Sequence, residues 1–281
     1  MTMLSTDPRG AAAFGVQWTT LDGPAVAGAG ATPSATWLAR PMPYLPALAA
    51  MEAVQAQRRA GAIADMAVYL EHEAVVTYGR ATPPGHLGWG SQSGVPAVAV
   101  PRGGLATYHG PGQLVGYLFL DLAKRAGGAE PDLHAYLRAI EDGLMAACEA
   151  EFGLPCVTRP GFTGVWTHGF DAANSDASGA GGGGAVELPR KVAAIGVACR
   201  RWITAHGFAL NVAPDLSAFR RIVPCGITDA ETTSVEREHA LAGRDFAPPS
   251  MKELAGRVHV HLTRALRHAG WCRSANPDAE V

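Results

Sequence analysis

Apolar residues recur at helical spacing in three stretches of the chain. A first helix is expected from about residue 45 to residue 60, and a second follows Asp132, a good N-cap residue, and ends at Gly153. Ser250 and Glu253 have the spacing of a capping box and predict the start of a third helix that ends near residue 270. The clearest apolar face belongs to the second helix and contains Leu133, Tyr136, Leu137, Ile140, Leu144 and Cys148.

Other apolar runs are short or alternate with polar residues, and these predict strands. Residues 192–199 and 202–212 alternate like two adjacent strands, and 114–122 is continuously apolar, as in a buried strand. Further strand-like runs cover 66–70, 74–78 and 97–100. Because strands and helices mix without regular strand–helix–strand alternation, we expect an α+β fold, a mixed α/β sheet flanked by helices, and no doubly wound sheet.

Two stretches are too poor in sustained apolar pattern to join a core. Residues 1–36 are rich in Ala, Gly, Thr and Pro and predict a mobile N-terminal extension. Residues 171–185 are polar and glycine-rich and predict a flexible insertion, either a tolerated surface loop or a lid over a nearby site. Residues 37–281 are expected to form a single domain around that insertion.

Composition and charge exclude several classes of protein. A hydrophobic fraction of 48% in 281 residues is enough for a sizeable core. The net charge of −2 gives no basic field for nucleic acid, and no apolar run reaches the roughly 20 residues that span a bilayer. Since no secretory signal is apparent, a cytoplasmic location is expected. The five cysteines form no Cys-x-x-Cys pair, so we expect reduced thiols and no metal site.

The segment with the most informative chemistry is 102–113, which reads RGGLATYHGPGQ. Its many glycines beside one Arg, one Tyr and one His imply close backbone contact with a ligand. It lacks the Gly-Lys-Ser/Thr ending of a P-loop and the spacing of a dinucleotide fingerprint. Elsewhere, His259 and His261 are two positions apart, diverge on a helix, and are expected at the surface or flank.

Three later segments complete a recognisable set. Residues 191–196, KVAAIG, lead into 206–211, HGFALN, and 222–227, IVPCGI, follow. In this order the four segments closely resemble the octanoyl (lipoyl) transferases, which move an eight-carbon acyl chain from acyl carrier protein to a lysine on lipoyl domains. The resemblance runs from about Tyr44 to about Gly243 and is weakest at 171–185. It implies a catalytic domain like that of biotin and lipoate protein ligases.

The resemblance also implies the partners of the chain. They are octanoyl-acyl carrier protein as donor, and as acceptors the lipoyl domains of 2-oxoacid dehydrogenase complexes and the glycine cleavage H protein. The reaction is the first step of endogenous protein lipoylation and takes no cofactor, because the substrate is carried on the phosphopantetheine of the carrier protein. A monomer is expected, with no nucleic acid or membrane partner.

Cys225 is the candidate nucleophile. It lies between Pro224 and Gly226, which restrict the chain on one side and allow close approach on the other. Exchange of one thioester for another is nearly isoenergetic, and a thiol is the best nucleophile among neutral side chains. From this segment alone Cys225 is equally well interpreted as a buried structural cysteine. The resemblance assigns it the acyl-enzyme thioester of a two-step relay.

Lys191 is its candidate partner. It precedes the apolar run 192–197, so its amine is expected beside buried surface. A desolvated lysine loses its proton more readily and can act as a base, whereas a charged one favours a neighbouring thiolate. A lone lysine is otherwise a solvated surface charge. In octanoyl transferases the corresponding lysine partners the cysteine, and the match in RKVAAIG extends that role to Lys191.

The remaining candidate residues would bind the acyl chain. Small and apolar side chains suit such a pocket, and glycine N–H groups can meet a carbonyl oxygen. His109 could orient a substrate group, shuttle a proton or be structural, and His206 is expected to shape the pocket or hydrogen-bond. The glycine-rich segment supplies the predicted substrate-binding residues Arg102, Gly103, Gly104, Leu105, Ala106, Thr107, Tyr108 and His109. The resemblance implies that Ala194, Ile195, Gly196, Gly207, Phe208 and Ala209 also line the pocket, with His206 beside them.

Acyl carrier protein is acidic, and residues 190–225 offer a basic surface for it or merely a solvated charged face. This segment contains Arg190, Lys191, Arg200, Arg201, Arg220 and Arg221. Two other functions stay open at this point. An ATP-dependent lipoate-protein ligase would adenylate its acid and need no nucleophilic thiol, and a non-catalytic acyl-chain or lipoyl-domain binding protein would bind without turnover.

Overall fold

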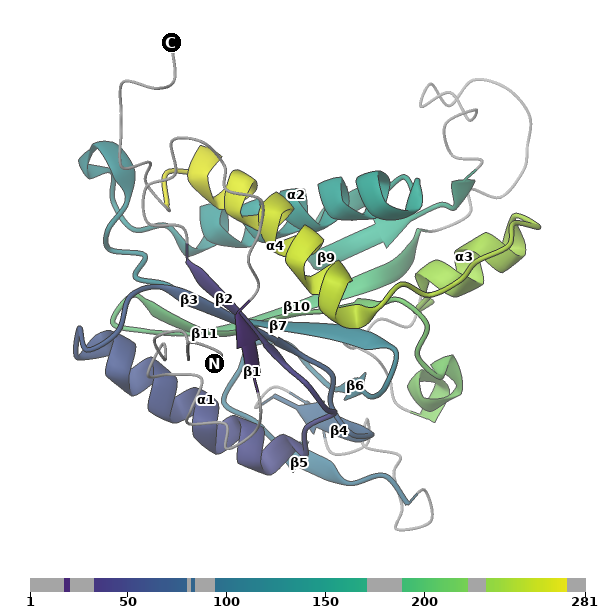
Figure 1. Ribbon diagram of the computed structural model, residues 1–281, viewed down its shortest axis with the longest axis horizontal. Helices are drawn as coiled ribbons and strands as arrows, with labels where there is room; N and C mark the ends of the chain where they lie inside the picture. The colour runs from purple at the N-terminus through teal and green to yellow at the C-terminus, as the bar shows by residue number, and fades with distance from the viewer. Residues whose placement is uncertain are drawn as a thin grey trace, which may run out of the picture.

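The computed structural model describes residues 18–20, 33–79, 82–83, 94–170, 189–221 and 231–271 of the 281-residue chain. These ranges form a mixed sheet with helices on both faces (Figure 1), as the sequence predicts. Within them, no helix is both long enough and apolar enough to cross a membrane. The predicted insertion at 171–185 and the cysteines at 225 and 272 lie outside the described residues.

An eight-stranded sheet is the framework of the domain, and only β2 and β3 pair in parallel within it. All seven residues of β7 are buried, as expected from its apolar run. In spatial order the strands are β1 (Trp18–Thr20), β2 (Ser34–Leu38), β3 (Met66–Leu70), β7 (Gln113–Phe119), β11 (Ile203–Asn211), β10 (Arg190–Arg200), β9 (Phe162–Thr167) and β8 (Val157–Arg159).

A second, three-stranded sheet lies beside the first. Its order is β5 (Ala97–Ala99), β4 (Val75–Tyr78) and β6 (Thr107–His109). Because β6 is the middle of the glycine-rich segment, this small sheet presents that segment to the large sheet. The turn 110–112 then leads directly into β7.

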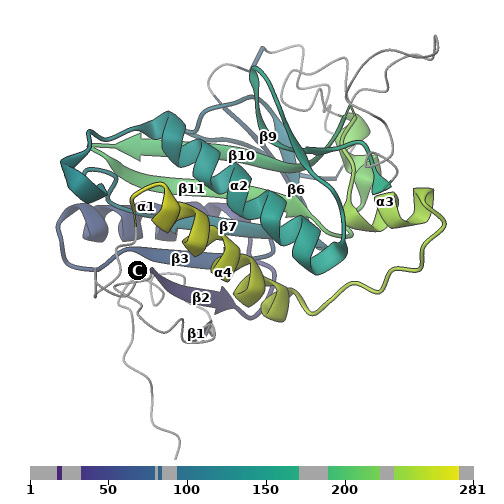
Figure 2. The same cartoon turned by 90° about the horizontal axis from the view of Figure 1, so that it is seen from above.

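Helices cover both faces of the large sheet. The helix α1 (Tyr44–Arg59) lies on one face, whereas α2 (Leu133–Phe152) and α4 (Met251–His268) cross the other face side by side (Figures 1 and 2). Asp132 caps α2 by accepting from the N–H groups of His134 and Ala135, and Gly153 ends it with φ 61°. The remaining helical elements are the 3-10 turns 126–128 and 216–221 and the short helix α3 (Val235–Leu241).

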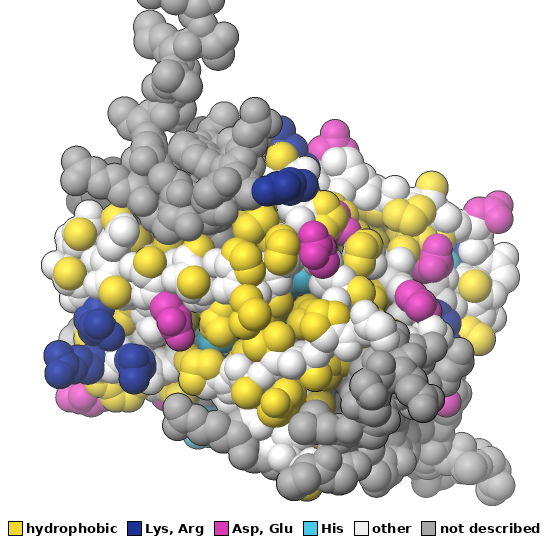
Figure 3. All heavy atoms as spheres, turned by 90° about the horizontal axis from the view of Figure 1, so that it is seen from below, with side chains coloured by type: hydrophobic (Ala, Val, Ile, Leu, Met, Phe, Trp, Pro, Cys, Tyr) yellow, Lys and Arg dark blue, Asp and Glu magenta, His cyan; other side chains and the backbone are white. Residues whose placement is uncertain are grey.

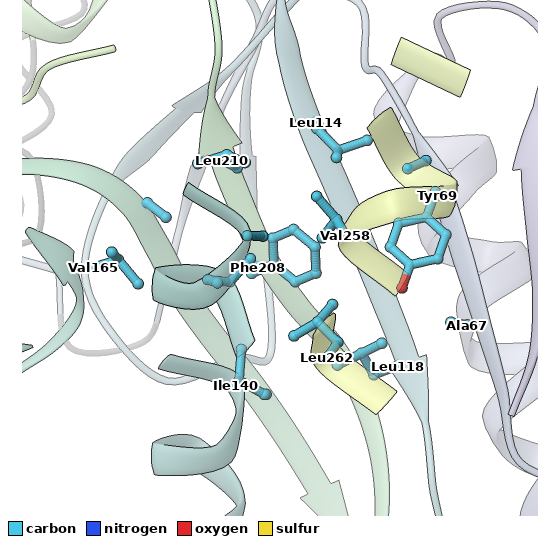
Figure 4. Close-up of a cluster of buried hydrophobic side chains, with 14 of the residues drawn as sticks. Ala67, Tyr69, Leu114, Leu118, Ile140, Val165, Phe208, Leu210, Val258 and Leu262 are labelled. Carbon is cyan, nitrogen blue, oxygen red and sulfur yellow. The ribbon is translucent and has the colours of Figure 1, made fainter. Parts of the chain in front are cut away.

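Alternation along β7 and β11 divides the core into two clusters, one on each face of the sheet. Phe208 packs with Val258 and Leu262 of α4 and with Ile140 of α2 (Figure 4). On the opposite face, the cluster beneath α1 contains Val115, Tyr117, Ala205 and Ala209. The face covered by α1 also meets the small sheet, and it carries the candidate site.

The hairpin between β10 and β11 has a two-residue turn, Arg201 and Trp202, with φ values of 51° and 64°. Positive φ at both positions is the requirement of a type I′ turn, whose twist matches antiparallel strands. The hairpin sets Ala194 opposite Ala209 and Gly196 opposite Gly207. Two of the recognised segments, 191–196 and 206–211, are therefore held in register by the geometry of this turn.

Three expectations from the sequence are wrong. The boundary at residue 36 falls inside β2, and Trp18–Thr20 pairs with that strand, so part of the expected extension belongs to the sheet. Ser250 occupies the N-cap of α4 but makes no side-chain capping bond. His259 is buried instead of lying at the surface. Its Nε2–H donates to the Pro33 carbonyl at 3.1 Å and its Nδ1 accepts from the Tyr69 hydroxyl at 2.9 Å, so both ring nitrogens are paired.

Candidate active site

A cleft lies on the α1 face of the large sheet, between that sheet and the glycine-rich segment. It is narrow, with a cavity volume of about 50 Å³, and its walls are mainly apolar. Figure 3 shows the molecule from this side, with hydrophobic side chains gathered across the middle of the face and basic ones toward its margins. Burying an apolar chain against such a surface would be favourable.

Arg102 shapes the wall formed by the glycine-rich segment. Its Nη1 donates to the carbonyls of Gly103 and Leu105, each at 2.9 Å. Its Nη2 donates to the carbonyl of Thr77 at 3.0 Å and to the Thr77 hydroxyl at 2.8 Å. Since four acceptors hold the guanidinium, it folds the segment back on itself and fixes the backbone beside the cleft.

The opposite wall consists of the facing strands β10 and β11, and glycine lets the chains approach. A Cβ at Gly207 would lie 2.2 Å from the Gly116 carbonyl oxygen of β7, a contact that only backbone movement could relieve. A Cβ at Gly196 would meet the Arg102 Cδ at 3.2 Å. The two glycines therefore have different tasks: Gly207 allows strand packing, whereas Gly196 leaves room beside the guanidinium.

A chain of hydrogen bonds connects this cleft with the segment after residue 230. The Gln113 amide donates to Asn211 Oδ1 at 2.9 Å, and the Asn211 amide donates to the Thr233 carbonyl at 2.9 Å. With its amide nitrogen donating, Gln113 presents Oε1 to His109 Nδ1–H at 2.7 Å. His109 Nε2 then accepts from the Thr77 hydroxyl at 3.3 Å. Both ring nitrogens are engaged, which favours an orienting role for His109 over a proton shuttle.

The histidines beside the cleft are uncharged at neutral pH. Burial, aided by the charges of His72 and Arg102, lowers the pKa of His109 to about 3. Burial lowers the pKa of His72 to about 4, and its Nδ1–H donates to the Met42 carbonyl while its Nε2 faces the Tyr117 hydroxyl. Burial and then Arg102 lower the pKa of His206 to about 4. The cleft wall is polar in places but carries no histidine charge.

Lys191 is buried, with 8% of its surface exposed, so it is no solvated surface charge. Its Nζ lies 5.0 Å from the centroid of the Trp166 ring on β9, a contact that stabilises a cation. Gly164, with φ 137°, leaves the space that the lysine occupies, because a Cβ there would lie 2.4 Å from Lys191 Cε. The absence of a side chain at Gly164 and the ring of Trp166 together make the place of this lysine.

A β-bulge turns Lys191 toward the cleft side of the sheet. The pairing of β10 with β9 shifts between Lys191 and Ala193, and the adjacent Val192 and Ala193 both pack into the cluster under α2 and α4. Lys191 and Ala194, on either side of this pair, therefore share the opposite face although three positions separate them. Lys191 itself precedes the cleft-lining residues Ala194, Ile195 and Gly196 along the strand.

Comparisons with known proteins identify the family. The lipoyl protein ligase A/B catalytic domain matches residues 43–259. An octanoyltransferase of Acidothermus cellulolyticus is 42% identical over 80% of this chain and 88% of its own. One of Rhodopseudomonas palustris (strain TIE-1) is 38% identical over 82% of each chain. The chain belongs to the octanoyltransferase family.

The fold is also similar to that of a solved lipoate-protein ligase. A lipoate-protein ligase A crystallised with ATP superposes with a TM-score of 0.53 over 83% of this chain and 84% of its own, at 13% identity. The expectation of a ligase-like catalytic fold is confirmed. As a member of the octanoyltransferase family, the chain is an acyltransferase of protein lipoylation.

Most of the predicted binding residues of this octanoyltransferase lie around one cleft. Three do not line it: Gly103 lines a neighbouring cleft, Ala106 is fully buried, and Tyr108 packs edge-on against Phe219 at 5.3 Å. Those that line it are Arg102, Gly104, Leu105, Thr107, His109, Ala194, Ile195, Gly196, His206, Gly207, Phe208 and Ala209. Their binding role stays a prediction.

The fold of the octanoyltransferase adds residues to the cleft that the sequence pattern does not indicate. Tyr44, Val115 and Tyr117 line it, and Gln113 and Asn211 hold its polar wall. For Gln113 and Asn211 the available sequence signal was a polar residue at the end of an otherwise apolar strand. Nothing in the local pattern distinguishes the first three from core residues.

The expected basic docking surface is wrong in part. Arg190 is buried, and its Nε and Nη2 donate to Glu238 Oε1 and Oε2, each at 2.8 Å. Arg200 and Arg201 are exposed but lie at the other end of β10, about 30 Å of extended strand from Lys191. The side chains at 220 and 221 lie outside the part of the octanoyltransferase that the structure describes.

Proposed function

We propose that this protein transfers an octanoyl group from octanoyl-acyl carrier protein to the acceptor lysine of lipoyl domains through a thioester on Cys225. The observation that carries the proposal is the apolar cleft beside Gly104, Ala194 and Gly207, in a chain whose relatives are named octanoyltransferases. Such a cleft suits a saturated acyl chain, and a thioester donor needs no nucleotide.

In the first step the Cys225 thiolate attacks the carbonyl carbon of the octanoyl thioester. A new carbon–sulfur bond forms, the bond to the phosphopantetheine sulfur breaks, and that sulfur leaves as a thiolate that takes up a proton from the Lys191 ammonium, which leaves the lysine neutral. A cation beside the reacting sulfur would favour its thiolate form. Lys191 in its charged form has this role in the proposal.

In the second step the acceptor amine attacks the Cys225 thioester. The amide bond forms, Cys225 leaves as thiolate, and the amine gives up a proton. A free lysine amine has a pKa of about 10.4 and is mostly protonated at pH 7, so a base must assist it. Neutral Lys191 is the proposed base. Its burial against Trp166 keeps bulk water from the amine.

The described contacts of Lys191 support its pairing with Cys225. The Lys191 N–H donates to the Glu231 carbonyl at 2.8 Å, and the Thr233 N–H donates to the Lys191 carbonyl at 2.8 Å. Glu231 is six positions after Cys225 along the chain, so these bonds join the strand of Lys191 to the segment that follows the cysteine in sequence. The sulfur–nitrogen approach itself is part of the proposal.

The test is mass spectrometry of the intact protein after incubation with octanoyl-acyl carrier protein in the absence of ATP. We expect one octanoyl adduct on the wild type, none on Cys225→Ser, and an unchanged adduct on Cys156→Ala. Cys156 is a matched control because its hydrogen bond with Cys148 and its burial raise the pKa of its thiol and keep it unreactive. Strict dependence on ATP and free octanoate would indicate a ligase, and binding without an adduct would indicate a non-catalytic protein.

Lys191 is tested by two variants. Lys191→Arg keeps a positive charge but cannot act as a base at neutral pH, so it should form the acyl-enzyme and fail to transfer it. Lys191→Met removes both properties and should slow both steps. Transfer to a lipoyl domain at the wild-type rate by Lys191→Arg would exclude the lysine as the base.

A further inference from the structure

A second cleft, of about 590 Å³, adjoins the first. It lies between α1 and the outer part of the β10–β11 hairpin, where Met51 and Gln55 of the helix face Ala198 and Ala205 of the strands. Its walls are more polar than apolar, and the apolar part includes Met51, Val197 and Ala198. None of the reaction steps above uses this space.

The two clefts meet at one level of the fold. On β10, Gly196 lines the first cleft and Val197 the second, and on β11 the change falls between Gly207 and Ala205. The glycine-rich segment contributes to both clefts, with Arg102 and Gly104 lining the first and Pro101 and Gly103 lining the second. At this boundary, His206 is the one residue of the described chain that lines both clefts.

The backbone of His206 places the ring at this boundary. In a regular strand His206 would share a face with Phe208, which packs under α2 and α4. His206 instead has φ 59°, the left-handed region, and its ring lies edge-on to Tyr117 on the cleft face at 6.3 Å. Its N–H donates to Met51 Sδ of α1 at 3.3 Å. Such backbone strain in a non-glycine residue costs about 1–3 kcal/mol and is concentrated at functional sites.

The ring is a suitable barrier for an apolar chain end. It is buried and uncharged at neutral pH, and Met51 of α1 holds the backbone N–H of the same residue. The acyl group would enter from the Lys191 end of β10 and extend along Ala194 toward Gly196, so its methyl end arrives at this ring.

We propose that His206 is the end wall of the acyl-binding cleft and limits the length of the acyl chain, and that the second cleft accepts the tail of a longer chain when the wall is removed. The inference rests on the proposed acyl transfer and deepens it by naming a specificity-determining residue.

The test compares octanoyl-acyl carrier protein with the dodecanoyl form, whose chain is four carbons longer. In His206→Gly the ring is gone and glycine accepts the left-handed φ without strain, so the fold should be kept. Each buried methylene favours binding about fourfold. The ratio of kcat/KM for dodecanoyl over octanoyl donors should therefore rise at least about tenfold, and an unchanged ratio in the folded variant overturns the proposal.

Two further variants make the result specific to the boundary. His206→Asn also tolerates left-handed φ but keeps a smaller polar side chain, and it should raise the ratio less than His206→Gly does. Ala198→Leu fills the second cleft and should leave octanoyl transfer by the wild type unchanged. In the His206→Gly background it should cancel the gain for dodecanoyl, whereas a gain that persists would mean that the longer tail lies elsewhere.

Calorimetric binding of octanoate and dodecanoate separates this inference from the proposed function. If the wild type forms no acyl-enzyme, the proposed function fails, yet the affinity ratio of the two acids in wild type and His206→Gly still tests the wall. If transfer occurs and His206→Gly shifts neither the affinity ratio nor the ratio of kcat/KM, His206 does not limit the chain length, and the proposed acyl transfer is unaffected.

Discussion

Replacing Glu238 by Leu is the sharpest test of how the strand of Lys191 is held. Glu238 on α3 accepts two hydrogen bonds from Arg190 at 2.8 Å, and the Thr233 hydroxyl donates to it at 2.5 Å. The side chains of Arg190 and Glu238 are 10% and 0% exposed. This ion pair therefore connects the start of β10 to the segment that pairs with Lys191, in a place that water does not reach.

The expected loss follows from the burial. Removing one partner of a buried, bidentate pair leaves a charge without compensation and costs about 3–5 kcal/mol. Arg190→Met should cost a similar amount by isolating the carboxylate. The double variant, Arg190→Met with Glu238→Leu, leaves no charge behind. It should lose only about 1 kcal/mol, mainly because the Thr233 hydroxyl keeps no acceptor.

The measurement is urea unfolding followed by circular dichroism at pH 7. A matched control is the exposed pair Arg237–Glu231, with a separation of 2.7 Å and exposures of 38% and 66%, where Glu231→Gln should cost less than about 1 kcal/mol. If Glu238→Leu costs no more than this control, or if the double variant is as unstable as the single ones, the account of the buried pair is wrong.

The pair also has a predicted pH signature. Burial alone would raise the pKa of Glu238, but the hydrogen bonds from Arg190 and Thr233 outweigh it, and the pKa lies below its usual value of 4.5. The folded state therefore binds this proton less readily than the unfolded state. The contribution to stability is present above about pH 4.5 and is lost as the pH falls through the lowered pKa, and Glu238→Leu should remove this part of the acid profile.

Two further predictions concern glycine and histidine. Gly164→Ala should displace Lys191 and lower kcat at least about tenfold, because the new Cβ would lie 2.4 Å from Lys191 Cε. Gly161→Ala, also at positive φ but with nothing within 4 Å, is its control and should lose stability without losing kcat. Stability should fall by about 5 kcal/mol between pH 7.5 and 5.5 in urea unfolding, because the unfolded state protonates four histidines near pH 6.5 that the folded state keeps neutral down to about pH 4 or lower. His259→Gln should reduce this loss by about 1 kcal/mol, and a flat profile would show that these rings are not buried and neutral. The four are His72, His109, His206 and His259.

Much of the fold could be predicted because the relevant signals are local. The apolar periodicity and caps of residues 132–153 define α2 to within a residue, and the alternation of 192–212 predicts the β10–β11 hairpin. The glycine-rich segment reveals itself by composition, since glycine marks places where backbones or ligands come close. This composition indicated the cleft-lining residues of 102–109, whereas those of 194–209 came from the resemblance to the family, and the binding role of both groups stays a prediction.

Residue-level mistakes have a common cause. His259 was expected at the surface because it diverges from His261 on a helix, and Arg190 because it belongs to a basic segment. Each is instead buried by a partner far along the chain, Tyr69 for His259 and Glu238 for Arg190. A buried polar group is stable only when it is paired, and the pairing depends on which elements meet. No local pattern contains that information.

The sequence by itself determined the elements, the hairpin register and the family, because periodicity, turn chemistry and motif spacing are properties of neighbouring residues. Tertiary structure alone decided which face each polar side chain takes. The bulge that returns Lys191 to the cleft face, the left-handed φ that turns His206 between two clefts, and the hydrogen-bond chain from Thr77 to Thr233 all depend on strands distant in sequence. Side-chain direction in a sheet is set by pairing and burial, and both are properties of the assembled fold.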